Sequence, residues 1–275
     1  MEPGIADPLD ARTISVAANR EDSFWRVEVL ERTESTNTLC LERAAQGEAA
    51  GLAVFAEEQS AGRGRRGNSW QAPPGSALLF SILLRPFHPP AQWHRLTLAA
   101  AIAVCRSVEE ISTCGSPQIK WPNDILLDSC KLAGILLEST VTAGAGGCVV
   151  IGIGLNVHAR SFPPGLRIPA TSLALASGHA PSRNEIASLL LSHLRRSIDE
   201  AFENWLGLRT SFAKRDVLAG RRIETELPDG AIVTGTASGI DDSGGLILHT
   251  DAGPQIVLRE AARITMLGHP DMDGI

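Results

Sequence analysis

The stretch AGRGRRGNSW, from Ala61 to Trp70, constrains the fold of this chain more than any other feature of its sequence. Its glycines have the spacing G-x-G-x-x-G, which in a dinucleotide-binding fold opens a helix and is followed by an acidic residue about 20 positions later. Here Pro73 and Pro74 prevent that helix, and the expected acidic position falls in the segment RPFHPP. The chain also contains no protein-kinase motif and no G-x-x-x-x-G-K-[ST] phosphate loop. The sequence therefore excludes three common folds that bind nucleotides through a glycine-rich loop.

The same stretch places three arginines, Arg63, Arg65 and Arg66, on glycine hinges. Guanidinium groups present fixed, forked donors that suit phosphate and carboxylate oxygens. Glycine hinges allow such a mobile loop to close over an anion and to exclude water from a reactive intermediate. A solvated basic turn and a nucleic-acid contact are the two other interpretations. The nucleic-acid contact is the weakest, because no basic and aromatic pattern extends the stretch and the chain has a net charge of −6.

Apolar patterning on both sides of this stretch predicts an α/β domain with mixed strand connections. Strands are predicted at WRVEVLERT, LAVFAEEQ, ALLFSILLRP, IKWPNDILLD (strand, turn, strand), KLAGILLEST and CVVIGIGLNV. Helices are predicted at NTLCLERAAQG, with Ser35 or Thr36 as its N-cap, at WHRLTLAAAIAVCRSVEEI, and over residues 183–214.

After about Val217 the pattern changes to short strands separated by turn residues. The strands are RRIETEL, AIVTGTASGI, GLILHT and QIVLREAARITML, with Pro-Asp-Gly, Asp-Asp-Ser-Gly-Gly and Asp-Ala-Gly between them. We therefore expect a loose leader over residues 1–23, the α/β domain over residues 24–216 and a small all-β barrel over residues 217–275.

Cysteine usage and apolar runs indicate the cellular setting. The five cysteines are scattered without a C-x-x-C pair, so neither a disulfide framework nor a zinc site is predicted. The N-terminal residues lack the apolar core of a signal peptide, and no apolar run approaches the roughly 18 residues of a membrane helix. These features predict a cytoplasmic protein without a membrane partner.

Polar residues gather at the ends of several predicted strands. Lys120, Asn123 and Asp124 lie on a tight turn between apolar runs, where they are costly unless they have partners. Lys131 opens an otherwise apolar strand, and Asn156 ends the glycine-spaced segment GIGLN. For Lys131 a surface position at a sheet edge is an equally good interpretation.

The motifs ESTN, EEQSAGRGRRGNSW, KWPND, KLAGILLE and GIGLNV occur in this order along the chain. Together they resemble the biotin–protein ligase family, the biotin–[acetyl-CoA-carboxylase] ligases, over about residues 24–268, and five motifs in one order make the resemblance specific. The resemblance implies an α/β (α+β) fold: a mixed-sheet catalytic domain similar to class II aminoacyl-tRNA synthetases, plus a small C-terminal SH3-like β barrel.

The resemblance also implies the activity. Members of this family use ATP and Mg²⁺ to convert biotin into biotinyl-5′-AMP, and then transfer biotin to one lysine of a biotin carboxyl carrier protein. Because a carboxylate attacks the α-phosphate, negative charge accumulates and fixed cationic donors supply most of the help. The sequence itself contains no metal-ligand cluster; the resemblance puts the Mg²⁺ near Asp124.

The functional positions of the family can be carried over residue by residue. Catalytic positions are matched by Lys131 and Arg65. Biotin-binding positions are matched by Ser35, Thr36, Asn37, Gln59, Gly62, Arg63, Gly64, Arg65, Lys131 and Gly134. Nucleotide-binding positions are matched by Arg66, Trp70, Lys120, Asn123, Asp124 and Asn156.

Two features depart from the family pattern. Asn68 stands where some members have a basic residue, so we expect a looser hold on the reaction intermediate. About 23 residues precede Phe24, too few for the helix-turn-helix domain that some members carry, so no DNA partner is expected. A monomer and a homodimer are both compatible with the sequence.

Two other functions remain open at this point. A lipoate–protein or octanoate–protein ligase or transferase has the same fold, although the arginine loop together with KWPND argues against it. A non-catalytic biotin sensor or an RNA-binding module belongs to a different class, and the acidic net charge weakens the RNA version.

Overall fold

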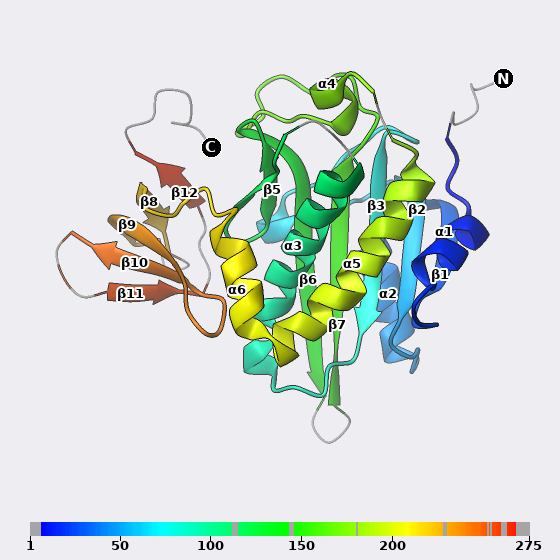
Figure 1. Cartoon of the computed structure of the whole chain (residues 1–275), viewed down its shortest axis with the longest axis horizontal. Coiled ribbons are helices and arrows are strands. Elements are labelled where there is room, and N and C mark those ends of the chain that lie inside the picture. The colour runs from blue at the N-terminus through cyan, green and yellow to red at the C-terminus, as the bar shows by residue number, and fades with distance from the viewer. Residues whose placement is uncertain are drawn as a thin grey trace.

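Figure 1 shows the computed structural model of the chain, in which residues 7–111, 115–142, 146–179, 181–227, 230–251, 253, 255–259 and 263–267 are described. Its larger sheet has the strand order β1-β2-β3-β7-β6-β5-β4. The strands are β1 (Arg26–Thr33), β2 (Leu52–Gln59), β3 (Ala77–Leu84), β4 (Gln118–Lys120), β5 (Asp124–Leu127), β6 (Cys130–Thr142) and β7 (Gly146–Asn156). β1 and β2 are parallel and the other neighbours are antiparallel, so the predicted mixed sheet is confirmed.

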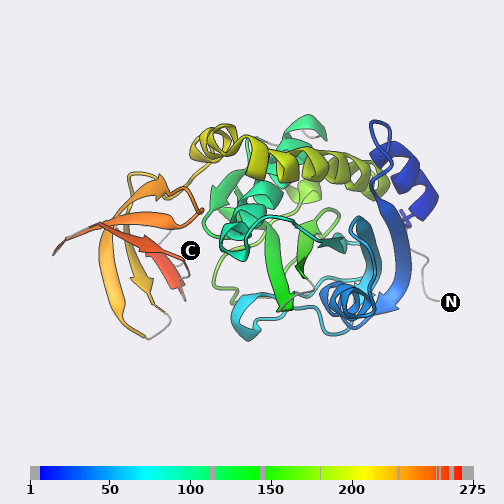
Figure 2. The same ribbon diagram turned by 90° about the horizontal axis from the view of Figure 1, so that it is seen from below.

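Helices cover both faces of this sheet. They are α1 (Ala11–Ala18), α2 (Thr36–Ala45), α3 (His94–Ile111), α4 (Leu173–Ser177), α5 (Arg183–Glu203) and α6 (Trp205–Ala213), with 3-10 turns at Arg65–Gly67 and Pro90–Gln92. In Figure 2, α3 and α5 lie on one face of the sheet and α2 lies on the other. Within the described residues, no helix has the length and apolarity needed to cross a membrane.

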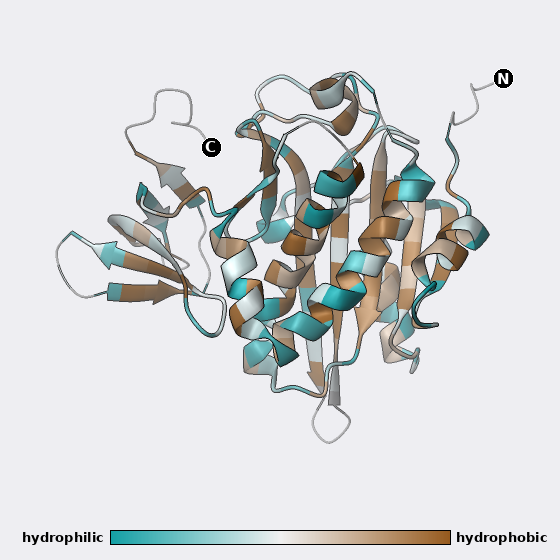
Figure 3. Cartoon of the chain, viewed as in Figure 1, coloured by the Kyte–Doolittle hydropathy of each residue, from teal (hydrophilic) through white to brown (hydrophobic). Residues whose placement is uncertain are grey.

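The alternation of side chains along β7 explains how one strand serves both faces. Val149, Ile151 and Ile153 are buried in the main core beneath α3 and α5, which Figure 3 shows as brown strands and helix faces. Cys148 and Val150 point the other way and pack in a second core under α2. Because successive side chains of a strand point to opposite faces, a strand with apolar residues at every position must be covered on both sides.

The C-terminal residues form a separate antiparallel sheet with the order β11-β10-β9-β8-β12. Its strands are β8 (Arg222–Glu226), β9 (Ile232–Ile240), β10 (Leu246–Thr250), β11 (Gln255–Leu258) and β12 (Arg263–Met266). The all-β character was predicted correctly, but the prediction of one strand over QIVLREAARITML is wrong. Leu258 pairs with Leu246, the first residue of β10, so the ladder ends there and the chain continues as β12 on the opposite edge.

The prediction of a loose leader is wrong for residues 11–18, which form α1. The side chain of Asp10 caps this helix by accepting a hydrogen bond from the Thr13 backbone at 2.7 Å. Ile14 and Ala18, one helical turn apart, are buried, and the helix packs against α5. The prolines that precede this segment indicated a loop, whereas the cap and the apolar pair decide the structure.

A buried ion pair fastens the N-terminal segment to the sheet. Arg183 at the start of α5 is fully buried, and its Nη1 lies 2.6 Å from Oε2 of Glu57 on β2, whose side chain is 7% exposed. The other carboxylate oxygen of Glu57 accepts a hydrogen bond from the Leu9 backbone at 2.7 Å. One carboxylate therefore joins a helix, a strand and the chain that precedes α1.

We predict that Arg183→Ala lowers the free energy of unfolding by about 3–5 kcal/mol, because it leaves the Glu57 charge buried without its partner. Urea unfolding measures this change. The matched control is Arg196→Ala, which removes an ion pair with Glu21 whose side chains are 52% and 71% exposed, and which should cost less than about 1 kcal/mol. Equal losses in the two variants would contradict the assignment of Arg183 as a buried clamp.

Candidate active site

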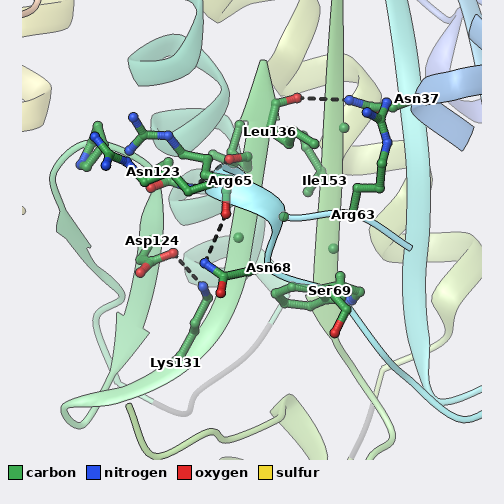
Figure 4. A pocket seen from close by; sticks show the side chains of 18 of the residues that line it. Asn37, Arg63, Arg65, Asn68, Ser69, Asn123, Asp124, Lys131, Leu136 and Ile153 are labelled. Carbon is green, nitrogen blue, oxygen red and sulfur yellow. Dashed lines mark hydrogen bonds and ion pairs between the residues drawn. The ribbon is translucent and has the colours of Figure 1, made fainter. Parts of the chain in front are cut away.

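A pocket lies on the α2 side of the larger sheet, beneath residues 61–70 (Figure 4), and Arg263 and Ile264 of β12 also line it. It brings together fourteen of the sixteen residues predicted for the site. These are Ser35, Thr36, Asn37, Gln59, Arg63, Gly64, Arg65, Arg66, Trp70, Lys120, Asn123, Asp124, Lys131 and Gly134. Segments separated by almost 100 residues therefore converge on one cavity.

Glycines in β6 and β7 make the floor of this pocket. Gly152 and Gly154 continue the face of β7 that buries Cys148 and Val150, and Gly134 of β6 pairs with Gly154. A Cβ atom on Gly154 would lie 2.3 Å from Cε2 of Trp70, and one on Gly152 would lie 2.1 Å from Oδ1 of Asn37. The indole and the amide reach the sheet only because these positions have no side chain.

One end of the pocket is a network of hydroxyl and amide groups. The Ser81 hydroxyl donates to Oδ1 of Asn37 at 2.5 Å and lies 2.7 Å from Oγ1 of Thr36. The Thr36 backbone N–H donates to Oε1 of Gln59 at 2.7 Å. Ser81 is fully buried on β3 and was missed by the sequence analysis, because a serine within an apolar strand carries no motif.

The other end of the pocket is strongly cationic. Seven described residues with positive side chains line the cavity: Arg63, which lies beside Asn37 at the hydroxyl and amide end, and Arg65, Arg66, Lys120, Lys131, Arg167 and Arg263. Among the described lining residues Asp124 is the one carboxylate, and its Oδ1 lies 2.6 Å from Nζ of Lys131. The chain has three lysines in all, of which Lys120 and Lys131 are in this pocket. An excess of fixed positive charge of this size suits a polyanion.

Two of these cations were not predicted. Arg167 lies in the segment after β7, and Arg263 begins β12 of the C-terminal sheet. Neither belongs to a recognisable motif, and the second comes from a part of the chain whose contact with the pocket cannot be inferred from patterning. Two hydrogen bonds hold the C-terminal residues against the pocket. Nζ of Lys120 donates to the Ile264 carbonyl at 3.2 Å, and Nε1 of Trp121 donates to the Gly244 carbonyl at 3.0 Å.

Residues 61–70 form a tight hairpin over the pocket. The Gly64 N–H donates to the Asn68 carbonyl at 2.7 Å, and the Asn68 side chain donates to the Arg65 carbonyl at 2.9 Å. Arg66 at the tip has a left-handed backbone with φ of 56°. Figure 4 shows the side chains of Arg63 and Arg65 pointing to opposite ends of the pocket, toward Asn37 and toward Asn123 respectively. The predicted mobility of this loop and the predicted effect of Asn68 on the intermediate stay predictions.

Two predicted site residues do not line the pocket but support its walls. A Cβ on Gly62 would lie 2.3 Å from the Trp70 carbonyl, so this glycine allows the two arms of the hairpin to meet. The Asn156 amide donates to the Thr171 carbonyl at 3.0 Å, and the Thr171 N–H donates to the Lys131 carbonyl at 2.9 Å. Asn156 therefore anchors the segment that carries Arg167 beside the strand that carries Lys131.

Burial in the pocket wall changes the protonation of Lys120. Its side chain is buried, and this burial lowers the pKa to about 8, although the nearby charge of Asp124 acts in the opposite direction. The positive charges of Arg167, Lys131 and Arg263 lower the pKa further. The fold thus holds this cation at a cost that a bound anion would relieve.

Comparisons with known proteins agree with this geometry. Residues 29–156 match the Biotin/lipoate A/B protein ligase family, and residues 219–260 match the Biotin protein ligase C terminal domain. The chain is 38% identical over 265 residues to the biotin–[acetyl-CoA-carboxylase] ligase of Mycobacterium tuberculosis, covering 94% of this chain and 96% of that protein. The chain belongs to the biotin protein ligase family. The resemblance found in the sequence is thereby confirmed.

Further relatives and one solved structure support the assignment. The biotin–[acetyl-CoA-carboxylase] ligase of Paracoccus denitrificans is 35% identical, over 83% of this chain and 96% of that protein. The bifunctional ligase/repressor BirA of Bacillus subtilis is 35% identical, over 74% of this chain and 63% of that protein. The structure of the biotin protein ligase of Aquifex aeolicus in complex with biotin and ATP aligns with a TM-score of 0.75 at 24% identity, over 87% of this chain and 98% of that one. This last likeness shows that the fold is shared.

We predict a pH dependence of stability that comes from Lys120. The pKa in the folded chain is about 8, against an ordinary value of 10.5, so the unfolded chain binds more protons between these two pH values. The free energy of unfolding should therefore rise with pH from 8 to 10.5 relative to that of Lys120→Met, by up to about 3 kcal/mol. Urea unfolding of both proteins at several pH values measures the difference. A difference that stays constant or falls over this range would show that the amine is not desolvated.

Proposed function

We propose that this chain activates biotin with ATP to biotinyl-5′-AMP and transfers the biotinyl group to a lysine of a carboxylase carrier protein. The observation that carries the proposal is a pocket with a neutral hydrogen-bonding end, where the charge of Arg63 is paired with that of Glu138, an apolar middle and a cationic end. Biotin has the same order of chemistry, since a urea ring is joined through an alkyl chain to a carboxylate. The names of the Mycobacterium tuberculosis and Paracoccus denitrificans relatives support the same activity.

The neutral end suits the urea ring because a urea both donates and accepts hydrogen bonds, as do the hydroxyl and amide groups of Thr36, Asn37 and Gln59. The middle of the pocket is the indole of Trp70 over the glycine floor. Its Nε1–H is buried and, among the described residues, has no hydrogen-bond partner.

In the first step, a carboxylate oxygen of biotin attacks the α-phosphorus of ATP, and the bond from that phosphorus to the bridging oxygen breaks to release pyrophosphate. Lys131 and Arg65 would neutralise the charge of the two anions as they meet. In the second step, the amine of the acceptor lysine attacks the acyl carbon, AMP leaves with the electron pair of the C–O bond, and the amine loses a proton. The cations Arg167 and Arg263 would hold the nucleotide phosphates.

A magnesium ion would neutralise part of the triphosphate charge, and Asp124 is the residue that would hold it. No group of three or more His, Cys, Asp or Glu side chains within the described residues could form a metal site without help. This matches the preference of Mg²⁺ for one or two carboxylates together with phosphates and water.

The direct test is incubation with biotin, MgATP and a purified carrier domain, followed by mass measurement of that domain. We expect a gain of one biotinyl group that depends on both small molecules. Lipoate and octanoate in place of biotin test the related ligases of the same fold. Pyrophosphate exchange that depends on lipoate and not on biotin would reassign the substrate.

We predict that Lys131→Ala lowers the rate of biotinyl-5′-AMP formation at least about a hundredfold, because a fixed cation beside the attacking carboxylate is lost. Single-turnover measurement with labelled ATP gives this rate. Lys214→Ala is the matched control, since the third lysine of the chain is exposed on the surface and should leave the rate unchanged. A rate for Lys131→Ala within threefold of the wild type would remove this residue from the reaction.

We predict that Arg65→Ser weakens the hold on biotinyl-5′-AMP about tenfold or more, since a charge-assisted contact to a phosphate is lost. The released intermediate should then modify lysines of bystander proteins. Adenylate dissociation, measured by dilution of the preformed complex, gives the change. If dissociation is unchanged and bystander labelling does not rise, the loop does not retain the intermediate.

A further inference from the structure

Ser81 of β3 carries a fully buried hydroxyl and is not among the residues that line the pocket. Its Oγ lies 2.5 Å from Oδ1 of Asn37 and 2.7 Å from Oγ1 of Thr36. Both partners belong to the first turn of α2, and both line the hydroxyl and amide end of the pocket. A hydroxyl that does not itself reach the pocket thus joins two side chains that do.

The amide of Asn37 has a defined orientation. Its Nδ2 donates to Oε2 of Glu138 at 2.8 Å and to the Leu136 carbonyl at 3.3 Å, a contact that Figure 4 shows. A carboxylate and a carbonyl can only accept, so the amide nitrogen faces them and the amide oxygen faces Ser81. Because an amide oxygen cannot donate, the Ser81 proton lies in the 2.5 Å contact with Asn37.

The same reasoning gives the direction of the Thr36 hydroxyl. Two hydroxyl oxygens 2.7 Å apart share a proton, and Ser81 already donates its own to Asn37, so Thr36 donates to Ser81. The other oxygen near this hydroxyl is Oε1 of Gln59 at 3.1 Å. That oxygen already accepts the Thr36 backbone N–H at 2.7 Å, and its contact with the hydroxyl is the longer one. The hydroxyl proton therefore goes to Ser81.

Two groups of fixed polarity then face the pocket. Oγ1 of Thr36 has given its proton to Ser81, so toward a ligand it can only accept. The oxygen of the Gln59 amide is held by the Thr36 backbone, so the amide presents its nitrogen, which can only donate. An acceptor beside a donor is the complement of a urea, whose ring N–H donates and whose C=O accepts.

We infer that Ser81 is a positioning residue that sets the selectivity of the site for a urea: it takes the Thr36 proton and thereby leaves Thr36 an acceptor for a ring N–H of biotin. The inference rests on the proposed function. Without the Ser81 hydroxyl, the Thr36 hydroxyl is free to turn, and its proton can point at the ring N–H. A buried network has this effect because each hydrogen bond determines the direction of the next.

A hydroxyl with a structural role alone predicts something else. Ser107 of α3 is as fully buried as Ser81, and it donates to the Ala103 carbonyl at 2.8 Å within the helix. It does not line the pocket. Loss of either hydroxyl removes a buried hydrogen bond and lowers the midpoint of thermal unfolding. Ser107 is therefore a matched control, because its hydroxyl has no connection to Thr36.

The test compares Ser81→Ala with Ser107→Ala, and biotin with the two cyclic carbamates in which one or the other ring N–H is replaced by oxygen. Calorimetry gives each Kd. We expect the wild-type protein to prefer biotin about a hundredfold over the carbamate whose ring oxygen faces Thr36, because two acceptors then meet. In Ser81→Ala the biotin Kd should rise about tenfold and this preference should fall to about tenfold, since Thr36 can then donate to the ring oxygen. Ser107→Ala should keep both wild-type values.

Kinetics and a second variant separate positioning from damage to the fold. In Ser81→Ala the KM for biotin should rise, while the KM for ATP and the kcat at saturating biotin stay at the wild-type values. Ser81→Cys keeps a side chain of similar shape with a weaker donor. It should lower the preference for biotin in the same direction by a smaller factor, and it serves as the test if Ser81→Ala does not fold.

Wild-type affinity for biotin in folded Ser81→Ala, or an unchanged preference over the carbamates in both Ser81 variants, would overturn the inference. If the wild-type chain bound no biotin, the proposed function would fail and this inference with it. A wild-type chain that binds biotin and both carbamates equally would leave the proposed function standing and would remove the role assigned to Ser81.

Discussion

The close approach of β6 and β7 at Gly134 and Gly154 is the constraint on which the pocket depends. These two glycines pair across the strands, and a Cβ atom would lie 2.3 Å from the indole of Trp70 at Gly154 and 3.0 Å from it at Gly134. Gly152 does the same for the amide of Asn37. Any larger residue would push the hairpin or α2 away from the sheet and would fill the cavity between them. The apolar residues elsewhere on both strands keep this open floor rigid.

The charge of the site follows from where the chain can place cations. Arg65 and Arg66 come from the hairpin, Lys120 and Lys131 from strands, and Arg263 from the second sheet. Burial of Lys120 lowers its pKa, which means that the fold concentrates positive charge at a cost to its own stability. A site that binds polyanions gains from such an arrangement, because the field is in place before the ligand arrives. The C-terminal sheet is thus part of the cavity wall as well as a separate structural unit.

Most of the elements could be predicted because their signals are local. Ser35 caps α2 as expected, and the apolar runs of β2, β3 and β7 lie where the sequence placed them. Two of the failed predictions also have local causes. The prolines among the first residues led to the prediction of a loop, although Asp10 caps a helix there. The strand predicted over QIVLREAARITML is divided because β10, the partner of β11, begins at Leu246 and offers no residue beyond it for pairing. Ser81, Glu138 and Arg167 were missed because their roles depend on partners far away in the sequence.

The sequence by itself determined the kinds of group that this protein uses and the family to which it belongs, since five motifs carry both. Only the tertiary structure decided how those groups divide the pocket. It turns Arg63 toward Glu138 and Arg65 toward Asn123, moves Asn156 from the lining to a supporting contact, and adds a wall from β12. The physical reason is that hydrogen bonds and ion pairs act over about 3 Å, a distance that depends on how the strands and the hairpin are packed and not on spacing along the chain.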